Sequence, residues 1–67
     1  MTNSLKLKAR IIEKGFTLTS LAKKVGISYV SMSYKVNNKR EFNQTEISSI
    51  CDILDIKDDE RSAYFFA

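Results

Sequence analysis

A pattern that marks the start of a helix occurs three times in this sequence of 67 residues. In each copy an apolar residue precedes a capping residue, and a second apolar residue follows five positions after the first. This is the spacing of a hydrophobic staple. Each cap stabilises its helix by about 1 kcal/mol, a large share of the stability of so small a protein. The pattern predicts helix starts after the caps Thr17, Ser28 and Asn43.

Apolar residues repeat at helical spacing within these segments and in one earlier segment. We expect helices over about 17–25, 28–36 and 43–54, and a first helix over 5–14 that Gly15 ends. The apolar stripe of the first helix consists of Leu5, Ala9 and Ile12, and Leu7 and Ile11 flank it. A fifth helix is predicted over 58–66, with Asp58 as its cap. Because proline is absent and only two glycines occur, the sequence predicts an all-α bundle of five helices.

Composition excludes most enzyme classes. The chain has no histidine and one cysteine, so it lacks Ser–His and Cys–His pairs and the ligands of a zinc site. We therefore expect a protein that is not an enzyme and that binds no metal, cofactor or small-molecule ligand. Cys51 shares an apolar stripe with Ile50 and Leu54, which assigns it to the core.

The same cysteine indicates where the protein resides. A lone cysteine cannot form an internal disulfide, and this is typical of a cytoplasmic protein. No apolar stretch is long enough to cross a bilayer, and no secretory signal opens the chain. We expect a cytoplasmic protein without a membrane partner.

Charge is distributed unevenly along the chain. Residues 1–40 carry nine cationic residues and one acid, a net charge of +8, whereas residues 41–67 carry a net charge of −5. This asymmetry favours one face that binds a polyanion and another that stays solvated. Two ordinary charged surfaces are the alternative.

The connection between the second and third predicted helices is short. The apolar stripe of the second helix ends at Val25, and the cap of the third helix is Ser28, so the turn consists of Val25, Gly26 and Ile27. Two helices joined by so short a turn with glycine in it cross steeply, in the geometry of a helix-turn-helix. The small side chain of Ala22 allows the two helices to approach closely.

Residues 17–33, with the sequence TLTSLAKKVGISYVSMS, resemble the helix-turn-helix of the lambda-repressor-like (Cro/repressor, XRE) family. In that family T-x-x-x-L-A-x-x-x-G-[IV]-S precedes the recognition helix, and an Asn-Gly-Lys stretch similar to residues 37–40 follows it. The resemblance implies a five-helix lambda-repressor-like bundle. It also implies a transcriptional regulator of phage or bacterial origin that binds a double-stranded DNA operator as a homodimer. At this length we expect a stand-alone Cro-like regulator, and the alternative is the DNA-binding domain of a longer protein.

Three positions depart from the family pattern. Leu18 stands where many members carry a glutamine that contacts phosphate, and Asn38 replaces the usual glycine. Lys35 falls at an apolar core position of the family. Because Val36 lies on the same inward stripe, we expect Val36 to be buried. We expect Lys35 to pack its stem at the rim and direct its ammonium to solvent or phosphate.

The helix over 28–36 has an apolar and aromatic outer face. If Met32 points inward, Val30 and Tyr34 point away from the bundle and Tyr29 lies in the exposed first turn. The resemblance implies that these three residues read base edges in the major groove, and we assign the neighbouring Ser33 to the same contacts. Val30 suits a thymine methyl, and the tyrosine hydroxyls suit bases or phosphates. The alternative is that the two rings cover the bundle or a dimer contact.

Six residues are expected to contact phosphates. Two of them cap helices whose free N–H groups attract anions, and the others lie at or after the end of the recognition helix. The six are Thr17, Ser28, Lys35, Asn37, Lys39 and Arg40. With four to six such contacts, log K falls with log salt at a slope of about −4 to −5 per monomer. A solvated basic loop is the alternative for Lys39 and Arg40.

Two further alternatives remain at this point. Tyr64, Phe65 and Phe66 close the core or form a dimer contact. The outer face of the 28–36 helix binds DNA or, if the chain is an antirepressor-like interaction module, binds another protein.

Overall fold

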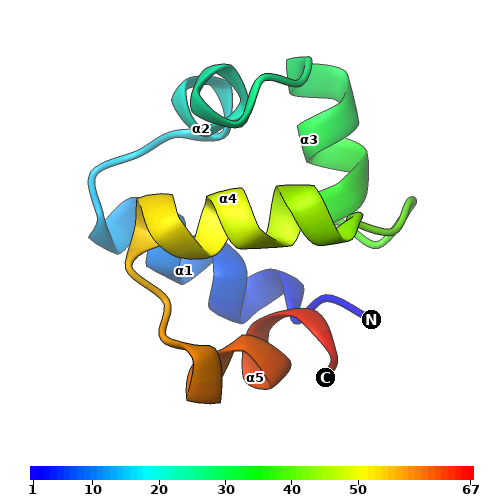
Figure 1. Ribbon diagram of the computed structural model, residues 1–67. Helices are drawn as coiled ribbons and strands as arrows, with labels where there is room; N and C mark the ends of the chain where they lie inside the picture. The colour runs from blue at the N-terminus through cyan, green and yellow to red at the C-terminus, as the bar shows by residue number, and fades with distance from the viewer.

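The computed structural model describes residues 1–67, and every regular element in it is helical. In chain order the elements are α1 (Ser4–Glu13), α2 (Leu18–Val25), α3 (Tyr29–Val36), α4 (Gln44–Leu54), η1 (Asp58–Glu60) and α5 (Arg61–Phe65), where η1 is a single 3-10 turn. Figure 1 shows α2 and α3 at one end of the bundle and η1 with α5 at the other. The predicted all-α bundle of five helices is confirmed. None of the helices has the length and apolar content required to span a membrane.

The three predicted helix starts are confirmed by their hydrogen bonds. The Thr17 hydroxyl accepts the backbone N–H of Ser20 at 3.1 Å, and the Ser28 hydroxyl accepts that of Ser31 at 3.1 Å. The Asn43 side chain accepts the N–H of Glu46 at 2.8 Å. Each side chain satisfies a donor that the first turn of a helix leaves free.

Four turns place a residue in the left-handed backbone region, where glycine and asparagine are favoured. Gly15 and Gly26 have φ of +81° and +90°, and Asn38 and Asp55 have φ of +64° and +56°. The Asn38 side chain accepts the Thr2 N–H at 2.9 Å and donates to the Thr2 carbonyl at 2.8 Å. These two bonds fasten the N-terminal segment to the loop after α3.

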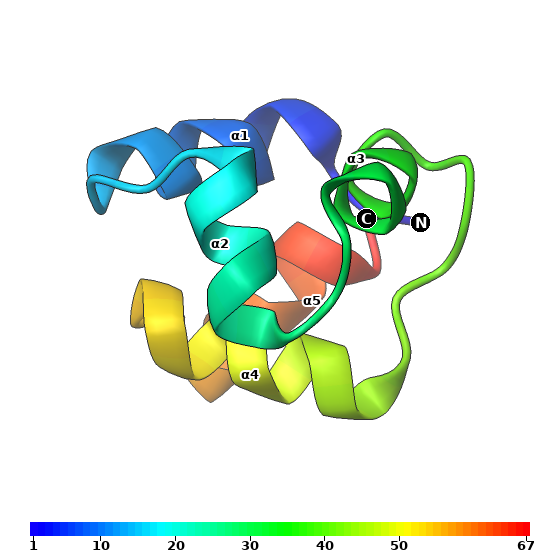
Figure 2. The ribbon, with the colours of Figure 1, turned by 90° about the horizontal axis from the view of Figure 1, so that it is seen from above.

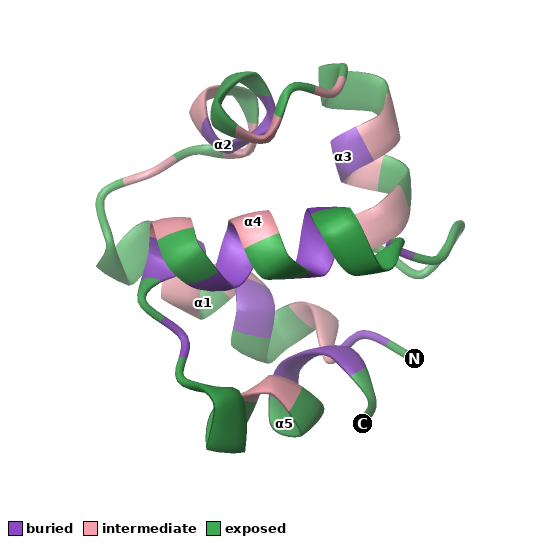
Figure 3. Cartoon of the chain, in the orientation of Figure 1, coloured by how far each residue is buried: buried purple, intermediate pink, exposed green.

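Buried apolar side chains from all five helices form the core, and the colouring of the ribbon in Figure 3 marks buried residues on the inner sides of α1, α3 and α4. The Phe42 ring packs edge-on against Phe65 with centroids 5.6 Å apart, which ties the loop before α4 to α5. Tyr64 and Phe65 are buried, so these two fill the core as predicted, whereas Phe66 is exposed. Cys51 is buried, as predicted.

The buried face of α1 is formed by Leu7 and Ile11. The other apolar positions that support the helical spacing, Leu5, Ala9 and Ile12, lie on the opposite, exposed face. Spacing alone did not distinguish the two faces because apolar residues occupy both.

The start of the last helix differs from the prediction. Asp58 does not cap it; the cap position is Lys57, and the chain passes through the 3-10 turn η1 before α5 begins at Arg61. The Glu60 carboxylate accepts the N–H of Lys57 at 3.3 Å. A side chain at the end of the turn therefore satisfies the free donor at its start.

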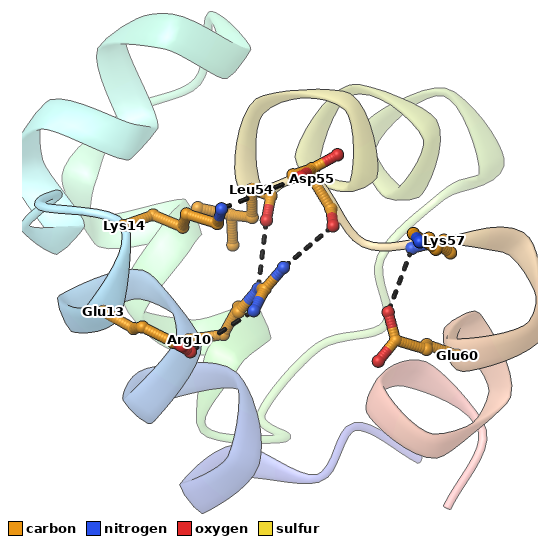
Figure 4. Close-up of polar contacts among 7 residues, drawn as sticks. All are labelled: Arg10, Glu13, Lys14, Leu54, Asp55, Lys57 and Glu60. Atoms are coloured by element: carbon orange, nitrogen blue, oxygen red, sulfur yellow. Dashed lines mark hydrogen bonds and ion pairs between the residues drawn. The ribbon is translucent and has the colours of Figure 1, made fainter.

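Arg10 of α1 caps the C-terminal end of α4 (Figure 4). Its Nε donates to the Leu54 carbonyl at 3.0 Å and its Nη2 to the Asp55 carbonyl at 2.8 Å. A cation at this end also interacts favourably with the helix dipole. Its Nη1 lies 3.3 Å from a Glu13 carboxylate oxygen, and Lys14 Nζ lies 3.8 Å from an Asp55 carboxylate oxygen.

Candidate nucleic-acid interface

A three-residue turn joins α2 to α3 through Gly26, Ile27 and Ser28. The backbone N–H groups of Gly26 and Ile27 both donate to the Ala22 carbonyl, at 2.8 and 3.0 Å. Figure 2 shows α2 across the view while α3 is seen almost end-on, so the two helices cross steeply. Ala22 is buried beneath the turn. This is the helix-turn-helix arrangement predicted from the short connection.

The outer face of α3 is accessible. Met32 and Val36 are fully buried, and this fixes the rotation of the helix. Tyr29, Val30 and Tyr34 keep 50%, 57% and 46% of their surface exposed. The predicted outward orientation of these residues is confirmed, and Ser33 lies half-buried beside them. The tyrosine rings do not cover the bundle.

The loop after α3 packs back against this face. The Arg40 guanidinium lies 5.6 Å from the centroid of the Tyr34 ring, in a cation–π arrangement. The Lys39 N–H donates to the Tyr34 carbonyl at 2.7 Å and holds the loop close to the helix. Tyr34 and Arg40, predicted to contact bases and phosphates separately, thus form one unit.

Asn37 has both polar groups of its side chain engaged. Its Nδ2 donates to the Ser33 carbonyl at 2.8 Å, and its Oδ1 accepts from Lys8 Nζ at 2.7 Å. The predicted phosphate contact through this side chain therefore requires the exchange of one of these bonds. Lys8, which comes from α1, was not predicted to belong to this region. The two residues lie 29 positions apart, and no local pattern links them.

The prediction that the Lys35 ammonium is free for solvent or phosphate is wrong. Lys35 Nζ lies 2.7 and 2.6 Å from the two carboxylate oxygens of Glu46, and the two side chains are only 14% and 10% exposed. Glu46 also accepts the N–H of Asn43 at 3.0 Å. A cation that satisfies a buried carboxylate costs several kcal/mol to remove, so Lys35 belongs to the core rim. Val36 is buried, as predicted.

The two remaining predicted contacts lie at helix starts. Thr17 and Ser28 are exposed, and their hydroxyls are occupied as acceptors in helix caps. Leu18, at the position that departs from the family pattern, packs partly buried against the core. A leucine is suited to this position because it adds apolar packing in place of a polar contact.

Five cations on the α2–α3 side of the chain have no carboxylate within 4.0 Å. Lys6 and Lys57, which lie elsewhere, also lack such a partner, whereas Arg10, Lys14, Lys35 and Arg61 each pair with an acid. The five are Lys8, Lys23, Lys24, Lys39 and Arg40. The acids 58–60 lie on η1, at the far end of the bundle in Figure 1. The end that carries α3 is therefore the end that attracts anions.

No group of three or more Cys, Asp and Glu side chains comes together as a metal site.

Comparison with curated proteins gives no match. A family model, described as a protein of unknown function (DUF739), matches residues 3–67. This match spans α1 through α5 and includes every residue of the surface described above. The chain therefore belongs to the DUF739 family.

Proposed function

We propose that this protein is a sequence-specific, double-stranded DNA-binding regulator of transcription of the Cro/repressor type. The observation that carries the proposal is the accessible α3 face of Tyr29, Val30 and Tyr34, held outward by a capped three-residue turn. An α-helix fits the major groove of B-DNA, where base edges and thymine methyl groups are exposed. The resemblance of residues 17–33 to the lambda-repressor-like helix-turn-helix assigns α3 as the recognition helix.

Base reading on this face depends on apolar and hydroxyl groups. Val30 packs on a thymine methyl, and the hydroxyls of Tyr29, Tyr34 and Ser33 donate to base acceptors or bound water. Helix α3 itself contributes no Arg, Asn or Gln that could make a bidentate base contact, and the Arg40 guanidinium beside it lies over the Tyr34 ring. Specificity therefore depends partly on DNA shape and on water.

Phosphate contacts come from Lys39 and Arg40 in the loop after α3, from Lys8 beside Asn37, and from the helix starts at Thr17 and Ser28. Only the three cations release counterions. The slope of log K against log salt is therefore about −3 per monomer, shallower than the −4 to −5 expected when Lys35 is counted.

We further propose, by analogy with the family, that two copies bind paired half-sites in the cytoplasm of a bacterial host. Selection of bound duplexes from a random library tests this directly, because a dimer on DNA selects a palindromic consensus. Recovery of no enriched sequence at low salt would contradict the proposal.

Alanine variants test the phosphate contacts on the selected duplex. Lys39→Ala and Arg40→Ala each weaken binding about fivefold to tenfold at low salt and reduce the salt slope by about 1. Lys57→Ala is the matched control, because Lys57 is exposed at the η1 end of the bundle. It changes the affinity by less than about twofold and leaves the salt slope unchanged.

The second candidate function is an antirepressor-like protein-interaction module that uses the same α3 face. The observation that favours it is the absence of long polar side chains from a face with two exposed aromatic rings. In that case Val30→Asp abolishes binding to the protein partner, whereas Lys39→Ala and Arg40→Ala leave it unchanged.

A further inference from the structure

The outer face of α1 carries an apolar stripe that nothing in the chain covers. Leu5 and Ile12 are 82% and 74% exposed, and the exposed Ala9 lies between them. The spacing of four and three residues places all three on one side of the helix, opposite the buried Leu7 and Ile11. Isolated exposed apolar residues are ordinary, but an aligned stripe on a short helix is typical of a contact surface.

We propose that this stripe is the interface of a symmetric dimer in which the α1 helices of two copies pack antiparallel. Centring the pair on Ala9 brings Leu5 of each copy level with position 13 of the other, one residue from Ile12. The small Ala9 side chains meet at the two-fold axis and allow the helices to approach to about 8 Å. Such an interface is isologous, since one patch contacts itself.

The charges beside the stripe favour the antiparallel arrangement. Lys6 and Glu13 are seven residues apart, two helical turns, so they lie on the same flank of α1. In an antiparallel pair, Lys6 of one copy lies near Glu13 of the other on both sides of the axis. In a symmetric parallel pair this flank of one copy lies on the opposite side of the interface from the same flank of the other, so neither Lys6 nor Glu13 meets an opposite charge there. A second copy is therefore the partner that this face complements.

A depression at one end of the stripe provides a place for Leu5 of the second copy. It has a volume of about 330 Å³ and lies where α1, the following turn and the start of α2 meet. Its apolar lining consists of Ile11, Ile12, Phe16 and Leu18, and its polar lining of Lys8 and Thr17, which also belong to the proposed phosphate contacts. In the antiparallel register Leu5 of the second copy reaches Ile12, at the rim of this depression.

The interface is small. Stable complexes bury about 800 Å² on each partner, and three short side chains with two flanking charges fall below this value. We therefore expect a weak dimer, with a dissociation constant of about 100 μM or higher. The proposal concerns the free protein and does not rest on DNA binding, because Tyr29, Val30 and Tyr34 lie outside the stripe.

Disulfide trapping tests the proposal at the two-fold axis. In the Ala9→Cys variant the two thiols meet at a Cα separation within the 4.4–6.8 Å that a disulfide needs. We expect it to form covalent dimers at least tenfold faster than Ser48→Cys, a variant at another exposed helical position, on α4. The natural Cys51 is buried and does not interfere. Adding Leu5→Asp to Ala9→Cys lowers the rate of covalent dimer formation to that of Ser48→Cys.

Charge reversal tests the register in the Ala9→Cys background. Lys6→Glu and Glu13→Lys each slow trapping about threefold to fivefold, and the double reversal restores the rate, as a directly coupled pair requires. All these side chains are exposed, and circular dichroism verifies that each variant stays folded. Equal trapping of Ala9→Cys and Ser48→Cys, or no rescue by the double reversal, overturns the proposal. Either result leaves the DNA-binding proposal unaffected.

Discussion

Lys35 Nζ lies within 2.7 Å of both carboxylate oxygens of Glu46, so a single ion pair joins α3 to the first turn of α4. The same carboxylate accepts the N–H of Asn43 and completes the capping box of α4. Glu46 therefore fixes the position of α3 relative to α4 and the start of α4 at once.

We predict that Glu46→Gln lowers the free energy of unfolding by about 2 kcal/mol. The amide still accepts the Asn43 N–H, but it leaves the Lys35 ammonium without a counter-charge in a site from which solvent is mostly excluded. Urea denaturation at pH 7 measures the change. Glu13→Gln is the control, because its exposed pair with Arg10 contributes less than about 0.5 kcal/mol. Equal effects of the two substitutions would show that the Lys35–Glu46 ion pair contributes no more to the free energy of unfolding than the exposed Arg10–Glu13 pair.

Stability is also predicted to depend on pH through Glu46. Burial raises the pKa of its carboxyl, but the hydrogen bond and charge of Lys35 and the N–H of Asn43 more than offset this. The pKa therefore lies below its ordinary value of 4.5. A group with a lowered pKa in the folded state stabilises the fold above its unfolded pKa and loses that contribution as pH falls through the folded value.

The contribution of Glu46 to the free energy of unfolding is therefore expected to be constant above about pH 5.5 and to decrease below about pH 4.5. Urea denaturation of the natural chain and of Glu46→Gln between pH 7 and pH 3 measures this difference. The two curves should converge as pH falls. A constant gap across this range would contradict the assignment to Glu46.

The two hydrogen bonds between Asn38 and Thr2 make the fold more stable with asparagine at position 38 than with glycine. Asn38→Gly relieves a backbone at φ of +64° but loses both bonds, and we predict a net loss of about 1 kcal/mol. Asn38→Ala loses the bonds and adds backbone strain, for about 2–3 kcal/mol in total. Thermal or urea unfolding of the two variants gives both values.

Gly26→Ala measures how much of the loss in Asn38→Ala comes from backbone strain at positive φ. Gly26 has φ of +90°, and a Cβ added there meets no atom within 4 Å. The substitution therefore measures backbone strain alone, about 1 kcal/mol or somewhat more. If Asn38→Gly proves stabilising, the bonds to Thr2 contribute less than the strain.

Cys51 is predicted to react only when the chain opens. Burial raises the pKa of its thiol above the ordinary 9.0, against the opposing influence of Arg61, so the thiol stays neutral and shielded at pH 8. Labelling with a thiol reagent should be at least about 100-fold slower than labelling of the added thiol in Ser48→Cys. Urea at the unfolding midpoint removes the difference. Fast labelling in the absence of urea would contradict the burial.

The helix starts were predictable because their signals are local. A cap, its N3 donor and its staple residue lie within six positions of each other, as at Thr17 and Asn43. The left-handed turns at Gly26 and Asn38 were predictable for the same reason, since a residue type that tolerates positive φ marks each one. The outward face of α3 followed from Met32 and Val36.

The errors came from contacts between distant segments. Lys35 finds its partner eleven residues away on another helix, and Lys8 reaches Asn37 across the bundle. Neither pair has a spacing that one helix can reveal. On α1, apolar residues occupy two opposite faces, so periodicity did not select the one built from Leu7 and Ile11. Tertiary packing decided each of these cases.

The two ends of the chain are joined by hydrogen bonds. The Ala67 N–H donates to the Met1 carbonyl at 2.9 Å, and the Asn3 N–H donates to the Tyr64 carbonyl at 2.8 Å. Figures 1 and 2 both show the termini side by side. A short peptide linker could therefore join them covalently without bending any helix, and new ends could be opened at the exposed turn around Gly15. If no new ends are opened, the cyclised chain would lose less conformational entropy on folding, because its unfolded state is already closed into a ring.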